Sequence, residues 1–342
     1  MRVHSHSSQS RNAQSSEPLV QKEHSKLLEV DNLTKVFTKG QGFAKSTITA
    51  VNEVSFSLEL DRPEIFTLAG ESGSGKSTVA KLILGFEEPS SGAVRFRGED
   101  IARTRGKAKF MKDVQPVFQN PFETFNPLKR IDTYLYETER IFRMSKAGEY
   151  PLVERSLELV GLSLTEIKDK YPSEMSGGQL QRVSIARALI PNPSLLIMDE
   201  PVSMIDASLR MSVINLFKEL KRQQGVSIIY ITHDLATAYY VSDRIAIMLR
   251  GQIVETGSVE EVLDSPLHPY TQLLRASVPV PDPANKWQKD IPLSDIEIRE
   301  YSRKGCKFAG RCSKAEDICN ECEPPDYRVN GRYVKCHLYK TA

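Results

Sequence analysis

The sequence has few cysteines, and none of its apolar runs is long. All five cysteines lie in the last 37 residues, beginning with Cys306. A membrane-spanning helix needs about 20 consecutive apolar residues, and the most apolar stretches, SLLIMDE and VSIIYITHD, are much shorter. Lys plus Arg number 46 and Asp plus Glu number 44, which gives a net charge of only +2. Bulk charge therefore gives no support for nucleic acid as a partner, and we expect a globular protein.

The N-terminal segment also has few apolar residues. It is rich in Ser, Gln and His and has no apolar core of the kind found in signal peptides. Because such a composition cannot bury enough surface to fold, we predict a disordered tail over residues 1–26. Without an export signal, the cysteines are not expected to form disulfides.

A phosphate-binding loop is the clearest motif. GESGSGKST, residues 70–78, matches G-x-x-x-x-G-K-[ST]. The preceding PEIFTLA predicts a buried strand, and the following TVAKLILGF predicts a helix with an apolar stripe that ends at Phe86. Glycines let the backbone wrap a phosphate, Lys76 neutralises its charge and Ser77 binds Mg²⁺. The residues assigned to the nucleotide here are Gly70, Glu71, Ser72, Gly73, Ser74, Gly75, Lys76, Ser77 and Thr78.

Two further apolar segments end in polar residues suited to hydrolysis. LLIMDEP places Asp199 and Glu200 at the carboxyl end of a predicted strand, where α/β sheets bind ligands. We expect Asp199 to hold Mg²⁺ through its water and Glu200 to polarise the attacking water. IIYITHD predicts another strand, and His233 after it is expected to contact the γ-phosphate.

MSGGQ, residues 175–179, predicts a second anion site. Its Ser and Gly residues precede a helix that stops before Pro191, so backbone N–H groups and a hydroxyl face outward. The first loop already cradles its own phosphate. We therefore expect two subunits stacked head to tail, with each capping the other's nucleotide through Ser176, Gly177, Gly178 and Gln179.

Taken together, these motifs resemble an ABC-type ATPase. MSGGQ corresponds to the signature loop, although Met175 stands where the family usually has Leu. The resemblance implies ATP and Mg²⁺ as ligands. It also implies a Q-loop at Gln119 that contacts Mg²⁺ and senses a transmembrane partner, and a D-loop residue, Asp206, at the dimer seam. Phe37 corresponds to the aromatic residue that stacks on adenine; the alternative is a core Phe at a strand end.

The fold implied is α/β, with a P-loop RecA-like core, an antiparallel β lobe near residues 27–60 and a helical subdomain at about 119–181. LKRIDTYLYETERIF and YPLVERSLELVGL predict helices of that subdomain. RIAIMLRGQIVETG predicts a hairpin that turns at Arg250-Gly251, and Ser258 predicts a helix N-cap. We place the nucleotide-binding domain at residues 27–257 and a small Cys-rich C-terminal region at 258–342.

The C-terminal region narrows the resemblance. HPYTQLLRASVPVPDP and the Cys-rich stretch after it resemble the C-terminal region of oligopeptide/dipeptide importer ATPases, and EPVSMID is closer to their F-type than their D-type subunit. This resemblance implies a second, different ATPase chain, two permease subunits, an extracytoplasmic solute-binding protein and a peripheral position on the cytoplasmic face of the inner membrane. Related importers carry oligosaccharides or nickel. A soluble ABC regulator acting on ribosomes or DNA is the alternative from another class.

The cysteine spacing is C-x5-C-x6-C-x2-C-x13-C. Only the third and fourth cysteines form the C-x-x-C pair typical of zinc sites. The resemblance implies a [4Fe–4S] cluster held by Cys306, Cys312, Cys319 and Cys336, with Cys322 left over. Zinc and unmetallated thiols remain the alternatives.

Overall fold

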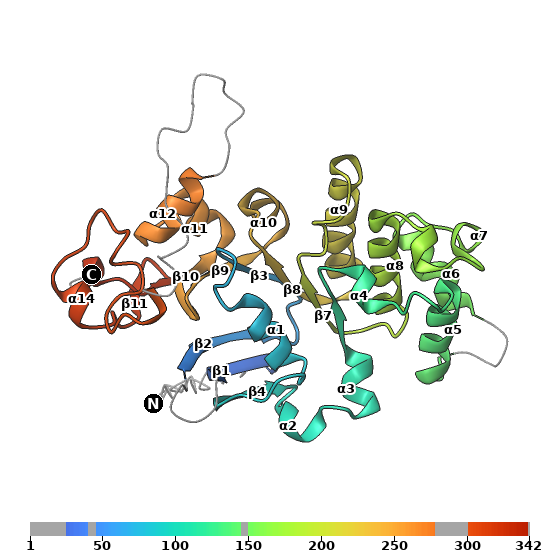
Figure 1. The fold of residues 1–342 in the computed structure, drawn as a ribbon, viewed down its shortest axis with the longest axis horizontal. Helices are drawn as coiled ribbons and strands as arrows, with labels where there is room; N and C mark the ends of the chain where they lie inside the picture. Colours follow the sequence, from blue (N-terminus) through green and yellow to red (C-terminus); the bar gives the residue numbers. More distant parts are fainter. Residues whose placement is uncertain (1–24, 40–45, 145–149, 278–299, 341–342) are drawn as a thin grey trace, which may run out of the picture.

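The computed structural model describes residues 25–39, 46–144, 150–277 and 300–340 (Figure 1). Residues 1–24 of the predicted disordered tail lie outside these ranges. Among the described residues, no helix combines the length and the apolar composition needed to cross a bilayer.

An eight-stranded mixed sheet forms the centre of the molecule, in the order β11-β12-β10-β9-β3-β8-β7-β6. Its parallel part comprises β9 (Arg244–Leu249), β3 (Ile65–Ala69), β8 (Ser227–Thr232), β7 (Leu195–Asp199) and β6 (Val114–Val117). Every residue of β3 and β8 is buried, as expected for parallel strands covered on both faces. The strands predicted from PEIFTLA, LLIMDEP and IIYITHD are confirmed as β3, β7 and β8.

Helices from several parts of the chain pack on this sheet (Figure 1). They include α1 (Lys76–Ile83), α8 (Gly177–Leu189), α9 (Ala207–Gln224), α10 (Leu235–Val241) and α11 (Val259–Asp264). The helix after MSGGQ stops before Pro191, as predicted, and the Ser258 side chain caps α11 by accepting from the Glu261 N–H. The predicted hairpin also forms, since β9 pairs with β10 (Gln252–Ser258) around Arg250 and Gly251.

The antiparallel lobe is larger than predicted. β1 (Lys26–Lys39) and β2 (Ser46–Glu59) form its hairpin, and β4 (Ser91–Phe96) with β5 (Glu99–Asp100) extend it on the β1 side. The short helices α2 (Ile101–Thr104) and α3 (Ala108–Asp113) lead back to β6. The predicted burial of Phe86 is wrong: α1 ends at Ile83, and Phe86 lies beyond it with 60% of its surface exposed.

Helices gather on the right of Figure 1, between β6 and β7 in the chain. The two helices predicted there are α5 (Ile131–Ile141) and α6 (Pro151–Leu159). The short elements α4 (Pro121–Thr124), α7 (Leu164–Ile167) and a 3-10 turn at Pro172–Glu174 join them to each other and to α8.

The C-terminal segments return to the main sheet. After α12 (Pro269–Ala276) the described chain resumes at Glu300, and β11 (Tyr327–Val329) and β12 (Arg332–Val334) form a hairpin that pairs with β10 through Glu255 and Thr256. The short α14 (Ile318–Glu321) and a final 3-10 turn at His337–Tyr339 lie on either side of this hairpin in the chain.

His268 makes the stability of this region sensitive to pH. Its Nδ1 accepts a hydrogen bond from the Tyr270 N–H at 3.0 Å, which only a neutral ring can do. Burial lowers the pKa of His268 from 6.5 to about 3. Below pH 6.5 the unfolded chain therefore binds a proton here that the folded chain does not, so stability falls as the pH falls towards 3.

Between pH 7 and pH 5, this one group is expected to lower the free energy of unfolding by about 2 kcal/mol. Urea unfolding at both pH values should show this loss in the wild-type chain and a smaller loss in His268→Asn, whose side chain can still cap α12. Equal losses in the two proteins would contradict the assignment.

Candidate nucleotide-binding and hydrolysis site

The phosphate-binding loop joins β3 to α1. Gly70, Gly73 and Gly75 have φ of 151°, 74° and 104°. A Cβ at Gly70 would lie 2.2 Å from the Met248 carbonyl oxygen, and one at Gly75 would lie 2.4 Å from that of Ala50. These close approaches require glycine, because no larger residue fits against those backbones.

Lys76 is the buried cation of the loop. Its Nζ donates to the carbonyls of Gly70 and Glu71, both at 2.8 Å, and to the Ser74 hydroxyl at 3.3 Å. Burial lowers the pKa of Lys76, and the nearby carboxylates of Glu200 and Asp199 oppose that shift. The loop carbonyls therefore hold the Lys76 ammonium in place. Burial disfavours its positive charge, and the negative charge of a bound polyphosphate would offset that effect.

Oxygen ligands suited to Mg²⁺ meet at the end of β7. Burial raises the pKa of the Asp199 carboxyl, whereas a hydrogen bond with the Ser77 side chain and the charge of Lys76 lower it. The structure thus brings together the hydroxyl and the carboxylate that the sequence assigned to the metal. A carboxylate, a hydroxyl and water are ligands that Mg²⁺ prefers, so these residues fit the ion.

Three predicted catalytic side chains meet at Glu200. Its Oε2 accepts from Gln119 Nε2 at 2.9 Å, and its Oε1 lies 2.8 Å from His233 Nδ1. Glu200 has φ of 46°, an unfavourable conformation for a residue other than glycine. Its backbone N–H donates to the Ile231 carbonyl at 2.9 Å, so the β7–β8 pairing maintains that conformation.

The MSGGQ loop lies elsewhere in the molecule. Ser176 caps α8 by accepting from the Gln179 N–H at 3.2 Å, and Gln179 Oε1 accepts from the Ser176 N–H at 3.1 Å. The atoms nearest to a Cβ on Gly177 or Gly178 belong to Phe122, Met204 and Ile205, and Figure 1 shows α8 well apart from α1. Asp206 follows this segment, is exposed and makes no side-chain cap for α9.

Phe37 lies near the C-terminal end of β1, where that strand pairs with the start of β2, and 37% of its surface is exposed. It stands opposite Ile48, two residues from Ala50, whose carbonyl contacts Gly75. The Lys35 ammonium lies 5.0 Å from the ring centroid. An exposed ring beside the phosphate-binding loop is compatible with base stacking, and this placement does not favour the alternative of a core Phe.

Four of the cysteine thiols lie near one another in the C-terminal region. Burial raises the pKa of the Cys336 thiol to about 11, and the thiols of Cys306, Cys312 and Cys319 add to this shift, so the four sulfurs lie in one neighbourhood. Yet the described residues contain no group of three or more His, Cys, Asp or Glu side chains placed to hold a metal ion. The predicted [4Fe–4S] cluster and the zinc alternative are therefore not supported. Cys306 and Cys312 pack against the apolar cluster that contains Tyr270 and Phe308.

Sequence reasoning missed two residues that support the site. Gln181 of α8 is fully buried, and its Nε2 donates to the Phe118 carbonyl at 3.1 Å, next to Gln119. The sequence signal for this residue was a glutamine placed between the apolar positions of α8. The Tyr270 hydroxyl accepts from the Glu71 N–H at 3.0 Å. No local pattern predicts a contact between residues so far apart in the chain.

The comparisons with known proteins agree with this geometry. The sequence pattern described as ABC transporter matches residues 51–203. The oligopeptide transport ATP-binding protein OppF of Haemophilus influenzae is 39% identical over 322 residues, which are 91% of this chain and 96% of that protein. The chain belongs to the ABC transporter family. A second pattern, the C-terminal region of oligopeptide/dipeptide transporters, matches residues 254–319 of this ABC protein.

Other relatives support the same assignment of this ABC protein. The oligopeptide transport ATP-binding protein AppF of Bacillus subtilis is 36% identical and spans 92% of this chain and 97% of that protein. Among solved structures, the dimeric ATP-binding cassette MJ0796 bound to ADP and Pi superposes with a TM-score of 0.59 at 26% identity. The superposed region covers 68% of this chain and 98% of the cassette chain, so the predicted P-loop ABC fold is confirmed.

Proposed function

We propose that this ABC protein hydrolyses ATP to drive the import of di- and oligopeptides through partner permeases. The observation that carries the ATPase part is the meeting of Glu200, Gln119 and His233 at the end of β7, beside the Ser77–Asp199 pair. The peptide part rests on the C-terminal region that this chain shares with oligopeptide/dipeptide transporters and on relatives whose names specify oligopeptide transport.

Each residue has a role in the proposed reaction. Lys76 and the loop amides bind the phosphates of ATP, and Phe37 stacks on its base. Ser77 and Asp199, with Gln119 nearby, would hold Mg²⁺, and the ion would supply positive charge against the phosphate oxygens. Glu200 accepts the proton of the attacking water as that water bonds to the γ-phosphorus and the bond to the β-phosphate oxygen breaks. His233 contacts the γ-phosphate.

The second subunit completes the site in this proposal. The MSGGQ loop presents the N-terminus of α8 away from the P-loop of the same chain, which supports its use on the ATP of a partner ATPase. Asp206, exposed after Met204 and Ile205, then lies at the seam. The dimer closes on ATP and opens after hydrolysis, and the permeases convert that motion into transport at the cytoplasmic face of the membrane.

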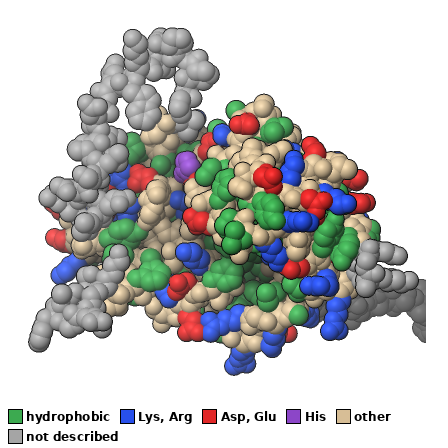
Figure 2. All heavy atoms as spheres, turned by 45° about the vertical axis from the view of Figure 1, so that its right-hand side comes forward, with side chains coloured by type: hydrophobic (Ala, Val, Ile, Leu, Met, Phe, Trp, Pro, Cys, Tyr) green, Lys and Arg blue, Asp and Glu red, His purple; other side chains and the backbone are tan. Residues whose placement is uncertain are grey.

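An apolar hollow supports a docking site for the permeases. It encloses about 600 Å³ between α3, β6, α5 and α8, next to the segment that carries Gln119. Exposed apolar side chains line it: Phe86 is 60% exposed, Met111 49% and Ile141 68%. Figure 2 shows a face of the molecule on which hydrophobic side chains surround a hollow, with Lys and Arg side chains near its rim. Such patches are typical of protein–protein contact sites.

Ile141→Asp tests this docking site. Because Ile141 is exposed, the variant should fold, and the ATPase activity of the isolated subunit should stay within about two-fold of wild type. Peptide uptake by cells should fall by about ten-fold or more, since an aspartate would be buried unpaired at the contact. Leu128→Asp is the matched control, because Leu128 is 86% exposed and lies outside the hollow. Equal uptake by the two variants would place the permeases elsewhere.

Uptake of labelled peptides tests the whole proposal. Cells carrying the wild-type chain should accumulate a labelled tripeptide, and cells in which only Glu200→Gln is present should not. Uptake of the free labelled amino acid serves as the control and should be equal in both strains. If peptide uptake is also equal, the next substrates to test are oligosaccharides and nickel, and the peptide proposal is withdrawn.

A further inference from the structure

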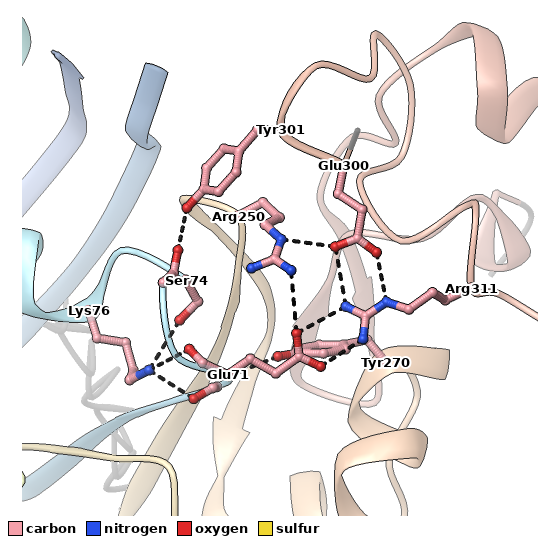
Figure 3. A network of polar contacts seen from close by, with 10 residues as sticks. Glu71, Ser74, Lys76, Arg250, Tyr270, Glu300, Tyr301 and Arg311 are labelled. Carbon is pink, nitrogen blue, oxygen red and sulfur yellow. Dashed lines mark hydrogen bonds and ion pairs between the residues drawn. The ribbon is translucent and has the colours of Figure 1, made fainter. Parts of the chain in front are cut away.

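The C-terminal region contacts the phosphate-binding loop directly (Figure 3). The Tyr301 hydroxyl donates to the carbonyl of Gly73, and the Tyr270 hydroxyl accepts from the N–H of Glu71 at 3.0 Å. Two residues of the loop, Glu71 and Gly73, are therefore hydrogen-bonded to residues about 200 positions later in the chain.

An ion network ties the same surfaces together. Arg311 binds Glu71 in a bidentate pair, with distances of 2.8 and 3.0 Å. The Arg311 Nε also donates to Glu300 at 2.7 Å, and Arg250 Nε donates to the other Glu300 oxygen at 2.9 Å. The side chains of Arg250 and Glu300 are each only 2% exposed. With two cations and two anions the network is neutral, and buried pairs of this geometry hold their positions closely.

The network acts on the part of the loop that positions the lysine. Lys76 donates to the backbone carbonyl of Glu71, the residue whose side chain Arg311 holds and whose N–H Tyr270 binds. On the next turn, the carbonyl of Ser74 accepts from the Gly251 N–H at 2.9 Å, directly after Arg250. Glu71, Gly73 and Ser74 of the loop are thus each hydrogen-bonded to residues far along the chain, so the shape of the phosphate cradle depends on these contacts.

Arg311 also neutralises a carboxylate that belongs to the phosphate-binding loop. The charge of the Glu71 carboxylate raises the pKa of Lys76, so this charge acts on the lysine that would hold a polyphosphate. An unpaired carboxylate at that position would repel ATP. The sequence assigned Glu71 to the nucleotide, but the structure turns its side chain towards Arg311, and its backbone carbonyl faces Lys76 (Figure 3).

We propose that Arg311 is a positioning residue through which the C-terminal region sets the ATP affinity of the phosphate-binding loop. The inference rests on the ATP binding proposed above. It gives the C-terminal region a role inside the ATPase cycle, because any movement of residues 300–311 changes the loop that holds Lys76.

Binding of Mg-ATP to the full-length protein tests this role. Arg311→Gln is expected to weaken binding by about ten-fold and to raise the KM for ATP similarly, whereas kcat at saturating ATP stays within about two-fold. Without Arg311, Arg250 alone faces the two carboxylates of Glu71 and Glu300, which leaves one uncompensated negative charge. Glu71→Gln added to Arg311→Gln should recover most of the lost affinity, because it removes that charge. Arg328→Gln, an exposed arginine of the same region, is the matched control and should bind as wild type does.

Each outcome separates the inference from the ATPase proposal. If the wild-type chain does not bind Mg-ATP, the proposed function fails. If the wild type binds and folded Arg311→Gln binds equally well, or if the two substitutions weaken binding additively, the positioning role is wrong. Should Arg311→Gln not fold, Tyr301→Phe decides, since it removes only the hydroxyl that bonds Gly73. A rise in Kd of about three-fold supports the inference, and an unchanged Kd overturns it.

Discussion

Glu200→Gln is expected to lower ATP hydrolysis by at least about 100-fold while Mg-ATP still binds. The amide has the shape of the carboxylate, and the contacts of Glu200 with Gln119 and His233 give it a defined position at the end of β7. An amide cannot accept the proton of the attacking water, so the γ-phosphate stays in place and the ATP-bound dimer should accumulate.

Hydrolysis and nucleotide retention measured together check this expectation. The variant should retain ATP through gel filtration with its partner ATPase, whereas wild type should retain little. Glu219→Gln, on the exposed side of α9, is the matched control and should behave as wild type. If Glu200→Gln hydrolyses ATP at the wild-type rate, another group activates the water.

Gly178→Asp is expected to reduce hydrolysis by about 100-fold or more, with no change in Mg-ATP affinity of the isolated subunit. A Cβ at Gly178 meets its nearest atom, the Met204 carbonyl oxygen, at 3.6 Å, an ordinary contact, so the chain should fold. The new carboxylate stands at the N-terminus of α8, which in the proposed dimer faces the γ-phosphate held by the partner. Its charge should therefore oppose dimer closure rather than nucleotide binding.

Gly178→Ala separates charge from size. It adds the same Cβ without a charge, and we expect it to retain most of the activity. The two variants should be compared by steady-state ATPase assays in the presence of the partner ATPase and by Mg-ATP titration of the isolated chain. Loss of affinity in the isolated Gly178→Asp chain would mean that MSGGQ serves the nucleotide of its own subunit.

The sequence predicts those parts of the fold in which local pattern and tertiary environment agree. β3, β7 and β8 are continuous apolar runs because both of their faces are covered, and polar residues follow them at the ligand-binding edge. Helix N-termini also follow from local sequence, since Ser176 and Ser258 are N-cap residues with Gln or Glu three residues later. Glu200 and His233 were assigned from their positions after such strands and Gln119 from the resemblance to ABC ATPases, and the structure brings the three together.

Features that depend on distant contacts could not be predicted. Phe86 continues the apolar spacing of α1, yet the helix ends at Ile83. The β12 strand is three residues long and is recognisable only by its pairing with β10. Arg311 and Glu71 are ordinary charged residues in the sequence and become a bidentate pair only when the C-terminal region folds back on the P-loop. Cysteine spacing likewise does not determine whether the sulfur atoms are arranged to bind one metal ion or cluster.

The most direct test of the central claim is affinity capture of Glu200→Gln from native membranes in Mg-ATP, with Mg-ADP as the reference and mass spectrometry to identify the bound proteins. We predict two multi-span permeases, a second ATPase with its own signature loop and a solute-binding protein, all enriched in Mg-ATP. The solute-binding protein would then be the reagent with which to define the peptides carried. Enrichment of soluble partners alone, such as ribosomal proteins, would contradict a role in transport.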